Sequence, residues 1–353
     1  MGRKRPVAAN RKTRTPGVTG MTMRTAEIIA ECEINHNGDV ELGKKLISAA
    51  KEAGASCVKF QCMVPTAFIA PGSSFMPLFE NVALPVEAFV ELKRHSDSIG
   101  MPIFSTAVDR EGLAMIRDIG FDRVKIGSTN ITHIDLLEEI AELKRPVYLS
   151  TGASNLSEID RALSILSRGT DDLTLFHCTA LYPAPNDRLN MSAMDTLKNA
   201  FPGVPIAYSD HSVGTTAAVI AVSKGAVALE KHFTLDHDLP GPDHKFSADP
   251  EEMAAYVATV RIAESMLGSP AKVPAVGEDA IRRAGRRYLT ALTDIAVGEK
   301  ITNENTRPRR IMVEGIDLSQ LIEACDVPRV KGWTAQKSIG ANASIAWSDL
   351  AGA

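Results

Sequence analysis

Short apolar runs alternate with amphipathic segments along most of the chain after residue 25. The strand-like runs cover residues 26–34, 57–61, 102–107, 123–128, 146–152, 173–179, 206–211 and 228–234. The segments with a helical period cover about 40–54, 85–99, 109–119, 135–144, 156–168, 190–200, 215–224 and 250–267. Strands that each lead into a helix predict parallel pairing with helical crossovers.

The segment ends carry residues that begin and end helices. Polar residues suited to helix N-caps precede four of the segments, and glycines follow three of them. The expected N-caps are Asp39, Asp109, Asp135 and Asn155, and the expected stops are Gly54, Gly100 and Gly120.

Eight strand–helix units within roughly 245 residues predict a (β/α)₈ TIM barrel over residues 26–268. A doubly wound open sheet is the rival fold. It usually has fewer strands, and no G-x-G-x-x-G motif follows the first strand. The barrel is therefore the predicted fold class.

The two ends of the chain lack the alternation of apolar runs and amphipathic segments that marks the middle. Residues 1–25 carry seven Lys or Arg and no acid, which predicts a disordered basic tail; a targeting signal or a nucleic-acid arm is the alternative. Residues 269–284 have little periodicity and predict a linker. Residues 285–353, with short β-like runs between glycines, predict a small, mostly β domain.

Residues 62–84 form a long connection between the second strand and its helix. The segment contains three prolines and three phenylalanines. Connections of this length often serve as lids or binding loops. The alternative is a loop that is packed on the protein surface and has no such role.

Composition narrows the class of protein. The formal net charge of -4 gives no field that favours nucleic acid or a membrane surface. Neither a transmembrane run nor an apolar signal segment is evident in this sequence. The five scattered cysteines fit reduced thiols. We therefore expect a cytoplasmic enzyme without a nucleic-acid or membrane partner.

Polar side chains end all eight predicted strands, at the face where TIM barrels carry their active sites. These residues are Glu31, Lys59, Gln61, Ser105, Thr106, Lys125, Ser128, Ser150, Thr151, His177, Thr179, Tyr182, Ser209, Asp210, His211, Glu230, Lys231, His232 and, beyond a Pro-Gly-Pro turn, Asp243. A structural barrel core would hold aliphatic residues there, so the set as a whole predicts an active site.

Lys59 and Lys125 lie within apolar strands, where an ammonium group without an anion is costly. Together with hydroxyls at Thr106, Ser128, Ser150 and Ser209 they suit a ligand that carries phosphate and carboxylate groups. One of the lysines could instead form a Schiff base, as in a class I aldolase.

His211 and His232 end neighbouring strands at matching heights, so two imidazoles can share one divalent ion. Mn²⁺ suits this donor set, with Mg²⁺ as the alternative metal. Hydrogen-bonded core histidines are the structural alternative.

Nine sequence strings in this order resemble the sialic acid synthase (N-acetylneuraminate synthase) family. They are AECEINHNGD at 30–39, VKFQ at 58–61, FSTAVD at 104–109, KIGS at 125–128, LSTG at 149–152, HCTALYPAP at 177–185, SDH at 209–211, LEKHFT at 229–234 and GPDH at 241–244. The C-terminal residues 285–353, with RRYL at 286–289, resemble the family's antifreeze-like (SAF, β-clip) domain.

The resemblance implies a metal-dependent synthase that condenses phosphoenolpyruvate with an N-acetylmannosamine-like sugar, making a nonulosonic acid such as N-acetylneuraminate or legionaminate. It implies a domain-swapped homodimer in which Arg310 reaches into the partner's site. The implied roles are Glu31 as the acid or base; His211 and His232 as metal ligands; Lys59, Thr106, Lys125, Ser128, Ser150 and Ser209 as phosphoenolpyruvate contacts; and Gln61, Tyr182 and Asp243 as sugar contacts.

Four positions depart from the family pattern. Glu33 and Asn130 stand where glycine and an acidic residue are usual, Ala180 where Asn or Ser is common, and Ile311 where proline follows Arg310. Besides the aldolase, these departures motivate a second alternative: a catalytically inactive relative that binds glycans.

Overall fold

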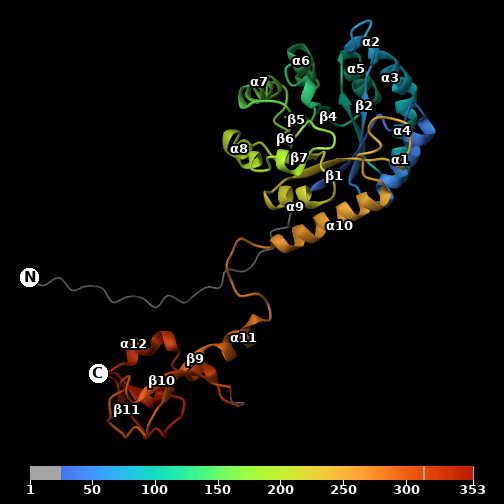
Figure 1. The fold of residues 1–353 in the computed structure, drawn as a ribbon. Helices are drawn as coiled ribbons and strands as arrows, with labels where there is room; N and C mark the ends of the chain where they lie inside the picture. Colours follow the sequence, from blue (N-terminus) through green and yellow to red (C-terminus); the bar gives the residue numbers. More distant parts are fainter. Residues whose placement is uncertain (1–24, 313–314, 353) are drawn as a thin grey trace, which may run out of the picture. The chain divides into compact units, whose positions relative to one another are not determined.

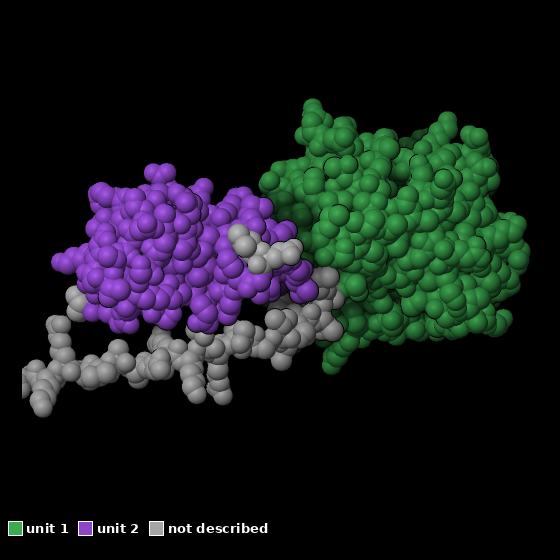
Figure 2. Space-filling model, turned by 90° about the horizontal axis from the view of Figure 1, so that it is seen from below, with its two compact units in different colours: residues 1–268 green, residues 269–353 purple. Residues whose placement is uncertain are grey.

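The computed structural model describes residues 25–312 and 315–352. The described residues form two compact units that divide after Gly268, each drawn in its own colour in Figure 2. The predicted basic tail, except Thr25, lies outside the described residues.

The first unit is built on a closed barrel of eight parallel strands in the order β1 to β8. The predicted TIM barrel is thus confirmed. The strands are β1 (Glu27–Glu33), β2 (Cys57–Cys62), β3 (Ile103–Ala107), β4 (Val124–Ile126), β5 (Val147–Ser150), β6 (Leu173–Cys178), β7 (Ile206–Asp210) and β8 (Ala228–His232).

Helices surround the barrel (Figure 1). They are α1 (Val40–Glu52), α2 (Pro65–Phe68), α3 (Met76–Val82), α4 (Val86–Ile99), α5 (Arg110–Ile119), α6 (Ile134–Glu142), α7 (Leu156–Leu166), α8 (Ala193–Ala200), α9 (Thr216–Ser223) and α10 (Pro250–Leu267), with 3₁₀ turns at Ser128–Asn130 and Asn186–Arg188. Leu, Ile, Val and Phe side chains fill the space between strands and helices.

Most of the predicted helix boundaries occur in the structure. The side chains of Asp39, Asp109 and Asn155 accept hydrogen bonds from first-turn N–H groups, and Gly100 and Gly120 end helices in the left-handed conformation. Asp135 was wrongly predicted as an N-cap. The cap is His133. Asp135 lies in the first turn of α6, where its negative charge interacts favourably with the positive end of the helix dipole.

The barrel interior is layered from one end to the other. At the amino ends of the strands, Glu27 pairs with Arg123 at 2.7 Å and accepts from the Tyr148 hydroxyl at 2.8 Å. An apolar layer follows, formed by Ile29, Cys57, Phe104, Phe176, Ala207 and Ala228. Because inward positions alternate along each strand, the next inward residues lie at the carboxyl ends of the strands, where they are polar.

The long connection after β2 is partly helical. It contains α2 and α3, and it packs Met63 and Val82 against Ile34 of the loop after β1. These contacts give the connection a packed base on the barrel; the structure does not test whether it moves as a lid.

The second unit is a small domain with short antiparallel strands around its own apolar core. Its elements are α11 (Glu278–Gly285), β9 (Arg287–Ala291), β10 (Thr306–Arg310), α12 (Val327–Val330), β11 (Thr334–Ala335) and β12 (Leu350–Ala351), with 3₁₀ turns at Leu318–Gln320, Ala324–Asp326 and Trp347–Asp349. Helix α11 begins inside the predicted linker, so that segment is not wholly irregular. None of the helices in the described residues is long and apolar enough to cross a membrane.

Candidate active site

The carboxyl ends of the barrel strands enclose one polar cavity. All the barrel residues to which the family resemblance gave a role line it except Asp243, and Glu33, Gly127, Cys178 and Glu230 join them. The other strand-end residues noted in the sequence do not line it; these are Ser105, Thr151, His177, Thr179, Asp210 and Lys231. The lining residues are Glu31, Glu33, Lys59, Gln61, Thr106, Lys125, Gly127, Ser128, Ser150, Cys178, Tyr182, Ser209, His211, Glu230 and His232. The structure therefore brings together side chains from all eight strands or the loops that follow them.

Lys59 lies at one side of the cavity and is almost fully buried. Its ammonium group forms an ion pair with Glu31 and donates a hydrogen bond to the Thr106 hydroxyl at 2.8 Å. Burial lowers the pKa of Lys59 to about 7, against the opposing effect of Glu230. Near neutral pH, small changes around this amine can therefore change its charge.

Lys125 is 1% exposed and pairs with Glu230, at 2.6 Å between Nζ and Oε2. The other oxygen of Glu230 accepts from the Ser209 hydroxyl at 3.1 Å. Burial alone would raise the pKa of Glu230, but Lys125 and Lys59 overcome this effect and lower it to about 2. Glu230 is thus a buried anion that links the two lysines.

Glu230 was among the strand-end residues noted in the sequence, but no role was predicted for it. The sequence did contain a signal for such a role, because Glu230 and His232 are two residues apart on β8 and must face the same side of the sheet. Only barrel closure shows that this side faces Lys59 and Lys125, which come from strands far away in the sequence.

His211 faces the cavity with a defined orientation. Its Nδ1 lies 2.8 Å from the carbonyl oxygen of Thr179, which can only accept a hydrogen bond. The proton of the neutral ring is therefore on Nδ1, and the lone pair is on Nε2. Burial lowers the pKa of His211, which favours this neutral form.

His232 lies beside His211, with 5.2 Å between the ring centroids. Strand pairing explains why the two rings are neighbours. Ser209 of β7 pairs with Glu230 of β8, and each histidine comes two residues after its member of that pair. Burial, reinforced by His211 and Lys59, holds the pKa of His232 well below its usual value. Two neutral imidazoles are thus available as ligands.

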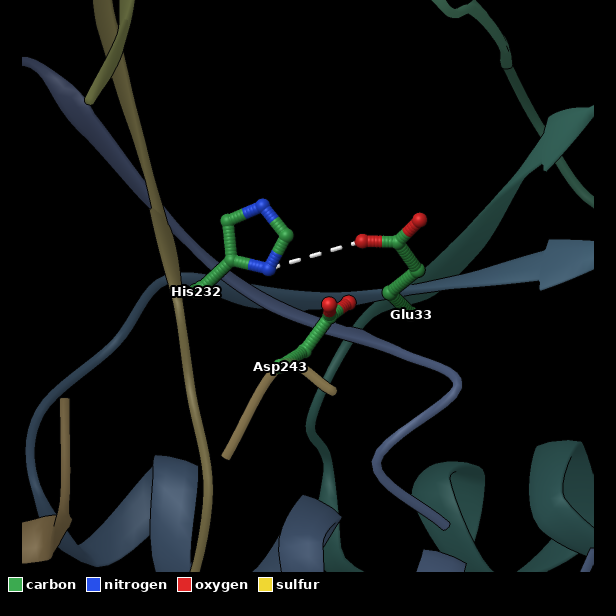
Figure 3. Close-up of side chains that lie close together, drawn as sticks. All are labelled: Glu33, His232 and Asp243. Carbon is green, nitrogen blue, oxygen red and sulfur yellow. Dashed lines mark ion pairs between the residues drawn. The ribbon is translucent and has the colours of Figure 1, made fainter. Parts of the chain in front are cut away.

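Glu33, His232 and Asp243 lie close together (Figure 3). One ligand atom from each lies within 4.8 Å of the other two, and Glu33 Oε2 lies 3.5 Å from His232 Nδ1. Burial, followed by the nearby Asp243, raises the pKa of Glu33 well above its usual range. Two crowded carboxyl groups of this kind are stabilised by a cation or by a shared proton.

The donor set fits a divalent metal ion. Neutral imidazoles and carboxylates are ligands that Mn²⁺ accepts, and burial holds both His211 and His232 in the neutral form that can ligate an ion. The histidine pair and the acidic group share His232, so this residue is the centre of any metal site here.

Tyr182 and Gln61 both line the cavity. The centroid of the Tyr182 ring lies 4.2 Å from that of His211, with the two rings tilted by 36°, and the residue is 53% exposed. The amide of Gln61 donates to Glu33 at 2.6 Å.

Two of the unusual positions have structural roles. The amide of Asn130 donates to the backbone carbonyl of Val108 at 2.8 Å, which ties the loop after β4 to the loop after β3. The Cβ of Ala180 lies near Gly152, together with the Ser128 hydroxyl and the Cys178 thiol. Ser128, which comes just before Asn130 in the same turn, accepts from the Gly152 N–H at 2.9 Å.

Arg310 lies at the end of β10 in the second unit and is exposed. The structure describes the two units separately, so the predicted reach of Arg310 into a partner's site stays a prediction. Ile311 follows it outside the strand.

Side chains from every strand converge at the carboxyl end of this closed barrel, and they combine buried lysines, hydroxyls and paired imidazoles. That arrangement defines the class as a TIM-barrel enzyme. The NeuB family model matches residues 46–272, and the chain belongs to this family.

Relatives and solved structures agree with this assignment. The N,N'-diacetyllegionaminic acid synthase of Legionella pneumophila is 37% identical over 318 residues, which cover 85% of this chain and 89% of that protein. Spore coat polysaccharide biosynthesis protein E of Chromobacterium violaceum superposes with a TM-score of 0.79 at 31% identity, covering 92% of this chain and 99% of that chain. The N-acetylneuraminic acid synthetase of Leptospira borgpetersenii gives a TM-score of 0.70 at 34% identity, covering 73% and 90%.

Proposed function

We propose that this protein condenses phosphoenolpyruvate with an N-acetylmannosamine-like amino sugar, forming a sialic-acid-type nonulosonic acid and releasing phosphate. The observation that carries the proposal is the pair of buried lysines, Lys59 and Lys125, beside two neutral histidines in one cavity. The first pair suits an anionic substrate and the second a divalent ion, and this reaction needs both.

Phosphoenolpyruvate binds at the lysine side of the cavity in this proposal. Each ammonium group has three N–H donors, so it can serve its present partner and a substrate oxygen together. The hydroxyls of Thr106, Ser128, Ser150 and Ser209 complete the contacts to phosphate and carboxylate oxygens. An incoming anion competes with Glu31 for Lys59, and this competition frees Glu31 to act as a base.

The sugar aldehyde binds at the histidine side, with Gln61, Tyr182 and Asp243 contacting its hydroxyl and amide groups. His211 and His232 hold the divalent ion, Mn²⁺ in our proposal, which when bound supplies Lewis-acid polarisation of the aldehyde. The protein orients the two substrates so that C3 of phosphoenolpyruvate faces the aldehyde carbon.

The bond changes follow from this arrangement. C3 of phosphoenolpyruvate attacks the aldehyde carbon, and water adds to C2 as Glu31 accepts one of its protons. That proton passes to the former aldehyde oxygen. The tetrahedral intermediate then loses phosphate by cleavage of the bond between C2 and the phosphate oxygen, and the proton of the C2 hydroxyl leaves with the phosphate, so that C2 becomes a ketone. Lys59 and Lys125 stabilise the negative charge on the phosphate as it leaves.

The proposed assembly is a homodimer in which the C-terminal unit caps the partner's barrel as an antifreeze-like domain. Support comes from the family resemblance of residues 285–353 and from relatives that match across both units. Arg310 would then add a cation to the partner's cavity.

Phosphate release tests the proposal. The purified protein is mixed with phosphoenolpyruvate and a panel of hexosamine aldehydes, free and 6-phosphorylated, with Mn²⁺, with Mg²⁺ or with EDTA. Metal-dependent release with one sugar supports the proposal and identifies the acceptor. If folded and metal-loaded protein releases no phosphate with any sugar of the panel, the result would contradict the proposal and favour the glycan-binding alternative.

One observation favours a second candidate chemistry. The lowered pKa of Lys59 is also what a Schiff-base lysine needs. Borohydride trapping with labelled pyruvate separates the two mechanisms. We expect no covalent label on Lys59, because its amine is held between Glu31 and Thr106; stable labelling would support the aldolase.

A further inference from the structure

Glu33 occupies an irregular position in β1. The pairing of β1 with β2 slips between Glu31 and Glu33, which is a β-bulge. Glu33 has φ of +37°, in the left-handed region that favours glycine. The bulge turns the Glu33 side chain toward the barrel axis, on the same side as Glu31, so an unfavourable backbone conformation carries a carboxyl group into the active site.

The carboxyl group of Glu33 is held from two sides. Its Oε1 accepts from the Gln61 amide at 2.6 Å, and Asp243 lies within 4.8 Å on another side. Its Oε2 is 3.5 Å from Nδ1 of His232 (Figure 3). Gln61 and Asp243 therefore fix the direction in which Glu33 presents Oε2.

His232 differs from His211 in one respect. Nδ1 of His211 is matched by the Thr179 carbonyl at 2.8 Å, whereas Nδ1 of His232 is buried and unpaired among the residues that the structure describes. His232 is 5% exposed. The oxygen of Glu33 is the acceptor that faces it, and a small movement would close the remaining gap into a hydrogen bond.

We propose that Glu33 is the positioning residue for His232: it accepts the Nδ1–H hydrogen bond and leaves the Nε2 lone pair for the metal ion. His211 and His232 would then both be Nδ1–H tautomers, one set by a backbone carbonyl and the other by a side chain. Histidine ligands commonly use their second nitrogen in this way, which fixes the ring and makes the metal-bound nitrogen more basic. The inference deepens the proposed function, because it concerns the metal site assigned there.

The rival role for Glu33 is direct ligation of the ion together with Asp243. That arrangement would need Nδ1 of His232 as the third ligand atom, since Nδ1 is the nitrogen that faces Glu33. It would separate the ion from His211, which is not a member of that three-residue group. The positioning role instead lets both histidines hold one ion.

Two substitutions at Glu33 and one elsewhere test the proposal. Glu33→Gly removes the carboxyl group and suits the positive φ. Glu33→Gln still offers an oxygen to His232 if the side-chain amide of Gln61 rotates by 180°. The new NH₂ group then donates to the Gln61 oxygen, and the new amide oxygen faces Nδ1 of His232. Lys144→Gly is the matched control, because Lys144 also has positive φ, at +53°, but is exposed in the loop before β5.

Two readouts other than turnover are used on the full-length protein. Histidine-selective ¹⁵N NMR of the metal-free protein reports which ring nitrogen carries the proton, with His211→Asn and His232→Asn assigning the signals. Calorimetry reports the Kd for Mn²⁺. Thermal melting shows whether each variant is folded.

The expected results separate the roles. The wild-type protein shows Nδ1–H for both histidines. The metal-free Glu33→Gly variant melts at a higher temperature than the metal-free wild type. In this variant His232, but not His211, loses its preference for the Nδ1–H tautomer. The Kd for Mn²⁺ rises by about tenfold or more. Glu33→Gln gives a smaller loss of affinity than Glu33→Gly, and Lys144→Gly binds Mn²⁺ as the wild type does.

Three results would overturn the proposal. The first is a wild-type protein in which His232 carries its proton on Nε2. The second is a Glu33→Gly variant with an unchanged tautomer and an unchanged affinity. The third is a Glu33→Gln variant that binds Mn²⁺ as weakly as Glu33→Gly while His232 keeps its Nδ1 proton, which indicates direct ligation. Because none of these readouts needs turnover, they stand even if no amino sugar is accepted.

Discussion

Lys125 and Glu230 form a buried pair whose effect on stability can be separated from the substrate-binding role that we propose for Lys125. Both residues are at least 95% buried by exposed surface, and each would be costly without the other. The same ammonium group also has donors left for a substrate oxygen. The two effects can be separated by substitution.

We expect Lys125→Met to lower the free energy of unfolding by about 3–5 kcal/mol, because it leaves Glu230 with only the more distant Lys59 as a counter-ion. The double substitution Lys125→Met/Glu230→Gln should recover most of this loss but not phosphate release. Urea unfolding and the phosphate assay measure the two effects. Equal stability of the single and double variants would show that the unpaired charge of Glu230 is not what destabilises Lys125→Met.

His36 makes the stability of the barrel depend on pH. Burial lowers the pKa of His36 to about 4, although Asp39 opposes the shift. The unfolded chain takes up a proton near the ordinary pKa of about 6.5 while the folded protein does not. Stability from neutral His36 is therefore complete above pH 6.5 and is lost as the pH falls from about 6.5 to about 4.

We expect His36→Asn to flatten this dependence, because an asparagine oxygen can still accept from the Gly38 N–H, as Nδ1 does at 3.1 Å. The difference between wild type and variant should change by about 3 kcal/mol between pH 7 and pH 4, measured by urea unfolding. A difference that is the same at both pH values would mean that His36 titrates normally in the folded protein.

At the scale of elements, helix α5 is held against the end of β2 by close backbone contact. Gly112 lies in its first turn and donates to the capping carboxylate of Asp109 at 2.6 Å. A Cβ at Gly112 would come 2.2 Å from the carbonyl oxygen of Cys62, the last residue of β2. This contact requires glycine even though the conformation is an ordinary helical one.

Gly112→Ala should therefore cost about 1–3 kcal/mol in the free energy of unfolding, since helix α5 must move away from β2. The neighbouring substitution Glu111→Ala, on the exposed face of the same turn, is the control and should change stability by less than about 0.5 kcal/mol. Thermal or urea unfolding measures both. If Gly112→Ala is as stable as the wild type, the helix has room that the structure does not show.

At the scale of the whole molecule, the proposed domain-swapped dimer makes each active site depend on two chains. Lys125 would come from one chain and Arg310 from the other. A chain with Lys125→Met and a chain with Arg310→Ala should each be nearly inactive as homodimers, while a mixed dimer keeps one intact site.

Unfolding and refolding an equal mixture of the two variants tests this arrangement. Random pairing makes about half of the dimers mixed, each with one of two sites intact, so about a quarter of wild-type phosphate release should return. Sedimentation confirms the dimer. If no activity returns from a mixture that forms dimers, Arg310 serves its own chain's site. If the Arg310→Ala homodimer is itself fully active, Arg310 has no part in the reaction.

Much of the barrel could be predicted from the chain itself because its signals are local. The apolar runs, the capping carboxylates of Asp39 and Asp109, and the glycines after helices each depend on a few neighbouring residues. Alternation along a strand also predicts that Glu31, Lys59 and His232 face inward together. The exception, Asp135, shows the limit, since an acidic residue suits the first turn of a helix as well as its cap.

Tertiary structure decided what these local signals leave open. Barrel closure brings Glu230 between Lys59 and Lys125, because residues far apart in sequence meet only when β8 pairs with β1. The slip in pairing at Glu33 depends on how β1 fits β2, and it turns that carboxyl group toward His232. The sequence by itself determined that polar residues end every strand, because this depends only on local pattern, whereas the register and bulge of the closed sheet decided which of them face the cavity and which of their atoms meet.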